Sequence, residues 1–267
     1  MSDSIYKLGT IGAGNMATAM LRSALTASIL QPDEVLASRR DPARREHLHN
    51  ETGVHVTGDN AALIQQSAIV MLALKPQQAA EFLTRHGSHF RPDQVLFSVL
   101  AGTTTTTLRR NVTAGVTIVR TMPNTPAQVG KGVTLLTGDA PSPDLVRFLN
   151  ASGSLIRVDE SQFDHATAIS GCGPAYIFLM AEAMARAGVE LGLDPVLAER
   201  LANETLFGAA ALLEHAWPEV DAPELRHRVT SPGGATAAAI GKLQENELIA
   251  IVSEAAKAAQ KRAEELG

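Results

Sequence analysis

The sequence has little that would support disulfide bonds, zinc binding or export. Among 267 residues there is one cysteine, Cys172, so no internal disulfide can form, and no CxxC or paired His/Cys spacing indicates a metal site. Glycines interrupt the amino-terminal apolar segment, no basic stretch precedes it, and no unbroken apolar run of about 18 residues occurs elsewhere. We therefore expect a cytoplasmic protein without a metal centre that does not enter a membrane.

Positive charge and aromatic side chains are also scarce. Lys and Arg number 23 against 28 Asp and Glu, which gives a formal net charge of -5. A phosphate backbone requires a positive face, so we expect no nucleic-acid partner. Hydrophobic residues make up 45% of the chain and aromatics only 4%, which indicates a folded protein with an aliphatic core. The length is sufficient for two ordinary domains.

Short β-branched segments alternate with helical stretches between Tyr6 and about Ser161. This alternation is typical of a parallel sheet covered by helices. We predict an α/β fold with a Rossmann-type, doubly wound, mostly parallel sheet. Its eight expected strands are KLGTIG, EVLAS, VHV, AIVMLAL, VLFSVLAG, VTIVRT, VTLLTG and SLIRVD.

An all-helical domain is expected after the sheet, because strand signals disappear beyond Phe163 and helical spacing continues to the end. We place the α/β domain at 1–163 and the helical domain at 164–267. The helix expected over 175–193 carries only three charged residues, spaced four apart, so most of its surface is apolar. That surface needs a partner, and we expect a homodimer at least.

A glycine-rich segment, IGAGNMA, joins the first strand to an amphipathic helix. In this G-x-G-x-x-A pattern Gly12 permits a tight turn, Gly14 lets a pyrophosphate approach the backbone, and Ala17 lets helix and strand pack closely. The helix amino terminus supplies free N–H donors. The segment predicts a dinucleotide site; the alternative is a glycine-rich turn without a ligand.

The residues after the second strand indicate which dinucleotide binds. A site for NAD would place a carboxylate there to bind the ribose hydroxyls, but the sequence has Ser38, Arg39 and Arg40. Two guanidinium groups beside a hydroxyl suit a 2′-phosphate. We predict NADPH, with NADH as a possible weaker cofactor; the alternative is that both arginines are ordinary solvated charges.

Four further residues stand where the third and fourth strand units reach their carboxyl ends, the sheet edge at which such folds bind ligands. They are Asn60, Ala73, Lys75 and Pro76. Lys75 can face the cofactor or, equally well, stand exposed to solvent at the start of a helix.

A second group of small residues occurs late in the chain, in the segment SPGGAT at 231–236. Its glycines leave backbone N–H groups uncovered at a helix amino terminus, which forms a ready anion site, and the Ser231 hydroxyl adds a donor. From spacing alone, a capped helix start after a proline-glycine turn is the favoured alternative.

These segments together resemble the 1-pyrroline-5-carboxylate reductase family, and the likeness runs from end to end. The segments that carry it are IGAGNMATAM, LALKPQ, SVLAGTT, VRTMPNTPAQVGKGVT, AISGCGPAYIF and VTSPGGAT. The resemblance implies reduction of 1-pyrroline-5-carboxylate to L-proline by hydride transfer from NADPH to the C=N bond, the last step of proline biosynthesis. It also implies an NADP-binding domain, a helical dimerisation domain with a pocket where two subunits meet, and in several members assembly of dimers into decamers.

The resemblance also assigns individual residues. It places the cofactor at Gly14, Asn15, Met16, Ser38, Arg39, Asn60, Ala73, Lys75 and Pro76, and the substrate at Ser231, Gly233, Gly234, Ala235 and Thr236. A cyclic imine can arrive already protonated, so no strong general acid is required, and we assign the Thr236 hydroxyl the role of orienting the ring nitrogen. The chain departs from the common family pattern at Cys172, where serine is usual, and in its threonine-rich 103–107 segment.

Three other functions are compatible with parts of the sequence. A β-hydroxyacid dehydrogenase would use a helix-borne lysine, yet no lysine occurs between Lys131 and Lys242. An F420-dependent NADP reductase would share the early segments but would not need SPGGAT. A non-catalytic NADP-binding protein is the alternative from a different class.

Overall fold

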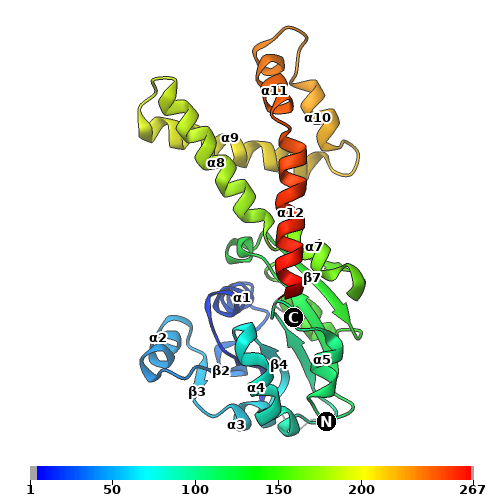
Figure 1. Ribbon diagram of the computed structural model, residues 1–267. Helices are drawn as coiled ribbons and strands as arrows, with labels where there is room; N and C mark the ends of the chain where they lie inside the picture. The colour runs from blue at the N-terminus through cyan, green and yellow to red at the C-terminus, as the bar shows by residue number, and fades with distance from the viewer. Residues whose placement is uncertain (1–4, 266–267) are drawn as a thin grey trace. The chain divides into compact units, whose positions relative to one another are not determined.

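The computed structural model describes residues 5–265, which form two compact units (Figure 1). The first unit comprises residues 5–172 and 257–265, and the second is Gly173–Ala256. The domain division predicted from the sequence, 1–163 and 164–267, stays a prediction.

Among the described residues, the first unit is built on an eight-stranded sheet of order β3-β2-β1-β4-β5-β6-β7-β8. Neighbouring strands are parallel except for β6 and β7, which are antiparallel. The predicted Rossmann-type, mostly parallel sheet is therefore confirmed. The strands are β1 (Tyr6–Ile11), β2 (Val35–Ser38), β3 (His55–Thr57), β4 (Ser67–Leu72), β5 (Val95–Ser98), β6 (Thr117–Met122), β7 (Gly132–Gly138) and β8 (Gly153–Arg157).

Helices cover both faces of this sheet, and each face has its own apolar core. One core receives side chains from α1 (Asn15–Thr26), α2 (Pro42–Thr52) and α6 (Pro143–Asn150). The other core receives them from α3 (Asn60–Gln66), α4 (Pro76–His86) and α5 (Thr105–Arg110).

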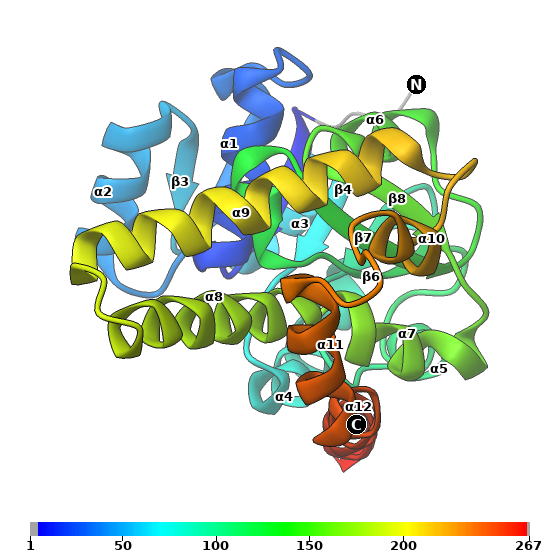
Figure 2. The same cartoon turned by 90° about the horizontal axis from the view of Figure 1, so that it is seen from above.

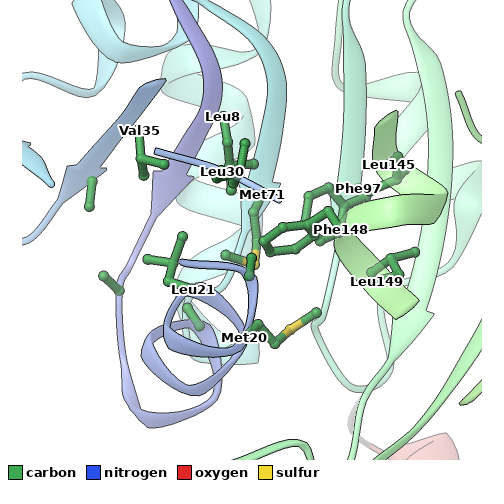
Figure 3. Close-up of a cluster of buried hydrophobic side chains, with 14 of the residues drawn as sticks. Leu8, Met20, Leu21, Leu30, Val35, Met71, Phe97, Leu145, Phe148 and Leu149 are labelled. Carbon is green, nitrogen blue, oxygen red and sulfur yellow. The ribbon is translucent and has the colours of Figure 1, made fainter. Parts of the chain in front are cut away.

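Successive residues of β4 contribute to opposite cores, as the pleat of a strand requires. Met71 lies in the first core, where Figure 3 shows it near Met20 of α1 and Phe148 of α6, whereas Val70 and Leu72 lie in the second. Since β4 is buried on both faces, its sequence is a continuous apolar run. The centre of the sheet is thus buried on both faces, and the carboxyl ends of β1, β2 and β4 bear the candidate site.

The helices after the sheet are α7 (Phe163–Ser170), α8 (Gly173–Glu190), α9 (Pro195–Ala216), α10 (Ala222–Arg228), α11 (Ala235–Glu245) and α12 (Leu248–Glu265). In the second unit α8 and α9 run side by side (Figure 2). Gly188 lets them approach closely, because a Cβ at this position would lie only 2.9 Å from Cβ of Ala198. Asp194 caps α9 by accepting hydrogen bonds from the N–H groups of Val196 and Leu197.

The helices of the second unit leave much apolar surface uncovered in the single chain. Leu191 is 84% exposed and Phe207 75% exposed, and no described residue of α8 is buried. Within the described part of the chain, one stretch, Glu160–Glu190, has the length and composition of a membrane-crossing helix, but it is divided by a turn between α7 and α8. Exposed apolar surfaces of this extent are typical of subunits that bury them against another chain.

Candidate cofactor and substrate sites

The glycine turn after β1 depends on Gly12. Its φ is +81°, in the left-handed region, and a Cβ there would lie 2.7 Å from the carbonyl oxygen of Ala73. The N–H groups of Gly12 and Ala13 donate to the carbonyl of Ser38 (3.3 Å each), and that of Ala73 donates to Ile11 (2.8 Å). These bonds bring the carboxyl ends of β1, β2 and β4 together at the turn.

The amino terminus of α1 has the space and the donors that an anion requires. Gly14 precedes the helix in extended conformation, and no side chain caps the first turn. A Cβ on Gly14 would lie 3.8 Å from its nearest neighbour, so the space above the turn is open. Gly14 and Asn15 are exposed, while Ala17 is buried against the sheet. The N–H groups of the first turn can therefore bind a pyrophosphate.

Ser38 and Asn60 meet beside the glycine turn although 22 residues separate them. The Ser38 hydroxyl donates to Oδ1 of Asn60 (2.7 Å), which joins the end of β2 to the start of α3. Ser38 is 4% exposed. The structure thus brings two predicted cofactor residues into one hydrogen-bonded pair.

Arg39 lies partly buried at this edge with its hydrogen bonds incompletely satisfied. One guanidinium nitrogen, Nη2, donates to Oγ1 of Thr18 (3.2 Å), whereas Nε is buried without a partner. Burial, and then the charge of Arg44, lowers the pKa of Arg39. A buried cation with an unpaired donor is costly. An anion such as a 2′-phosphate would offset that cost, so Arg39 fits its predicted role.

A pocket of about 370 Å³ opens between the end of β2 and α4. Predicted residues on its wall are Gly12, Ser38, Arg39, Arg40 and Asn60. Arg39 also lines a second pocket, of about 500 Å³, together with Asn15 and Thr18 of α1. Six of the predicted cofactor residues therefore line two cavities that share Arg39.

The remaining predicted cofactor residues do not line the first pocket. Lys75 is exposed and stands at the amino-terminal cap position of α4, with Pro76 in the first turn. Ala73 is held beside Gly12, and Met16 packs against the core below α1. Cofactor contact by these residues stays a prediction.

The α4 side of this pocket holds residues that the sequence alone did not mark as functional. One face of α4 contributes Gln78, Glu81, Phe82, Arg85 and His86. Their spacing of three and four residues shows that they share a face. Only the fold shows that this face is turned toward the end of β2.

The SPGGAT segment lies in the second unit and forms a turn before α11. Gly233 has φ +71°, and the N–H of Gly234 donates to the carbonyl of Ser231 (3.0 Å). A Cβ on Gly234 would lie 2.5 Å from Oγ of Ser231, so a side chain there would require the Ser231 hydroxyl to move. No side chain caps α11, and Ser231 and Thr236 are exposed. The segment offers free N–H groups and two hydroxyls, as expected for an anion site.

Comparison with known proteins gives separate matches for the sheet and for the helices that follow it. A family model described as pyrroline-5-carboxylate reductase dimerisation matches residues 160–266, and one described as NADP oxidoreductase, coenzyme F420-dependent, matches 7–102. The chain is 35% identical to the pyrroline-5-carboxylate reductase of Synechocystis, with 98% of both chains covered. It is 36% identical to that of Mycobacterium leprae, covering 100% of this chain and 98% of the relative.

Solved structures are similar over the same length. A Plasmodium falciparum pyrroline carboxylate reductase with NADP bound has a TM-score of 0.87 at 28% identity, with both chains covered in full. A pyrroline-5-carboxylate reductase from Coxiella burnetii has a TM-score of 0.86 at 34% identity, with 99% of each chain covered. The similarity therefore includes both the sheet and the helical part.

Proposed function

This chain belongs to the pyrroline-5-carboxylate reductase family, and we propose that it reduces 1-pyrroline-5-carboxylate to L-proline with NADPH, the last step of proline biosynthesis. The observation that carries this proposal is the end-to-end match to reductases of that name. The match includes both the glycine turn, which fits a dinucleotide, and the SPGGAT turn, which fits an anionic substrate. The F420-dependent model, by contrast, covers only residues 7–102.

The residues of the first unit hold the cofactor, which when bound supplies the hydride. The first turn of α1 and the bare backbone at Gly14 bind the pyrophosphate. Arg39, with Ser38 and Arg40, binds the 2′-phosphate through charge-assisted hydrogen bonds, which are the stronger ones in proteins. The position of Arg39 on the walls of both pockets is what supports this assignment most directly.

The SPGGAT segment holds the substrate. Backbone N–H groups at the start of α11 and the Ser231 hydroxyl bind the carboxylate. The Thr236 hydroxyl accepts a hydrogen bond from the protonated ring nitrogen and orients the C=N bond. Because the imine carries its proton from solution, this site needs no strong acid.

Replacing Thr236 by alanine is expected to lower kcat/KM about tenfold, since one hydrogen bond to a charged group contributes about 1.5 kcal/mol or more. The dissociation constant of NADPH should not change, because Thr236 contacts the substrate. Steady-state kinetics and cofactor titration measure the two quantities. Thr236→Ser should restore most of the rate, and a Thr236→Ala enzyme with an unaltered rate would remove this residue from the mechanism.

The chain forms homo-oligomers, as its dimerisation segment shows. We propose that the exposed apolar helices of the second unit are buried against a second copy and that dimers assemble further into decamers in the cytoplasm. Light scattering after gel filtration is expected to give a mass of at least two chains of 28.2 kDa. A monomer at micromolar concentration would contradict this expectation.

The activity is tested by following NADPH oxidation with and without 1-pyrroline-5-carboxylate. We expect oxidation only when the imine is present, with L-proline formed in equal amount. If the protein instead binds NADPH without turnover, it is a non-catalytic NADP-binding protein. Reduction of NADP by reduced F420 would favour the F420-dependent alternative.

A further inference from the structure

The pocket at the end of β2 has a second wall that the proposed function leaves unused. Five residues on one face of α4 form it: Gln78, Glu81, Phe82, Arg85 and His86. The opposite wall holds the groups to which the 2′-phosphate is assigned, namely Ser38, Arg39 and Arg40. The two walls enclose one cavity, so a phosphate on the β2 wall also faces α4.

His86 is held in position at this wall by aromatic contacts. Its ring packs against Phe82 with centroids 4.7 Å apart, and Phe82 is itself 8% exposed. The ring of His89 meets His86 edge-on at 5.6 Å. Nδ1 of His86 is buried and has no hydrogen-bond partner, so a hydrogen bond from the ring to a ligand would have to come from Nε2. The imidazole is thus oriented by packing rather than by a protein hydrogen bond.

The charges around the cavity favour an anion. Arg39, Arg40 and Arg85 line it, opposed by one carboxylate, Glu81. Burial, followed by the charges of His89 and Arg85, lowers the pKa of His86, and Asp59 acts weakly in the other direction. A neutral imidazole can still donate a hydrogen bond to a phosphate oxygen.

We propose that His86 and Arg85 bind the 2′-phosphate from the α4 side, so that α4 as well as the end of β2 determines the preference for NADPH over NADH. This inference rests on the proposed function, which places the 2′-phosphate in this pocket. Glu81 lies in the same wall, and its negative charge repels the phosphate, which limits the preference for NADPH over NADH. The cofactor lacking the phosphate gains nothing from His86 or Arg85.

The test is a set of dissociation constants for NADPH and NADH, measured by calorimetry on the full-length protein. His86→Phe retains a ring against Phe82 and removes the hydrogen bond. It should raise the dissociation constant of NADPH about fivefold and change that of NADH by no more than about twofold. Arg85→Gln should also raise the dissociation constant of NADPH. Glu81→Gln should lower it about threefold, because a negative charge near the phosphate is removed. His89→Phe is the control, because His89 touches His86 but does not line the pocket.

Two results would overturn the inference. If His86→Phe weakens the binding of NADPH and of NADH equally, the ring contacts a part of the molecule that both cofactors share. If it changes neither dissociation constant, α4 does not take part in cofactor recognition. Failure of the proposed function would appear differently, as a wild-type protein that binds neither cofactor or that binds NADPH without reducing 1-pyrroline-5-carboxylate. Circular dichroism of each variant separates a loss of binding from a loss of fold.

Discussion

Replacing Gly14 by alanine is expected to weaken NADPH binding about 100-fold, or ~2.7 kcal/mol, without unfolding the protein. The φ of Gly14 is -76°, which alanine adopts readily, and its Cβ would enter open space. That space is where the pyrophosphate must approach the backbone, so a methyl group there excludes it. Fluorescence titration measures the dissociation constant, and the Tm should stay within about 2 °C of the wild type.

Gly12→Ala is the matched comparison, because its defect lies in the fold. Gly12 has φ +81°, and a methyl group would collide with the carbonyl of Ala73. This variant should lose about 1–3 kcal/mol of folding free energy, measured by urea denaturation. Unchanged NADPH affinity in Gly14→Ala would show that the glycine turn is not the phosphate site.

Replacing Arg39 by glutamine is expected to reduce the preference for NADPH over NADH by at least about 100-fold. The guanidinium would make two charge-assisted hydrogen bonds to the 2′-phosphate, each contributing about 1.5–3 kcal/mol. NADH lacks this group, so its dissociation constant should change little. The ratio of kcat/KM values for the two cofactors measures the effect.

Arg44→Gln serves as the control for Arg39. Arg44 is exposed, its closest acidic partner is Asp41 at 3.9 Å, and it does not line the pocket. It should change the cofactor preference by no more than about twofold, because an exposed charge of this kind contributes little. An Arg39→Gln or Arg39→Asp variant with the wild-type preference would exclude Arg39 from phosphate recognition.

The eight strands could be predicted from sequence because most are short apolar runs bounded by turn residues. Strands buried on both faces, such as β4 and β5, have sequences unlike those of surface helices. The antiparallel pairing of β6 with β7 was not predicted. Residues 123–131 alone connect these strands, whereas a parallel crossover needs a dozen or more residues. The short connection between the two strands therefore indicates an antiparallel pair.

The site could be predicted only where its signal is local. The turn at Gly12 and Gly14 depends on residues adjacent in sequence, and so does the turn at Gly233 and Gly234. The bond between Ser38 and Asn60, by contrast, forms because two strand ends meet at one sheet edge. The spacing of Phe82 and His86 shows that they share a face of α4, but not what that face meets. Such contacts require the tertiary structure.

The proposed function requires that hydride passes directly from NADPH to the imine carbon of 1-pyrroline-5-carboxylate on this protein. NADPH carrying deuterium at its transferable position tests this most directly, with the product examined by mass spectrometry and NMR. We predict one deuterium at C5 of L-proline for each NADPH oxidised. Oxidation of the labelled cofactor without deuterated proline would contradict the claim.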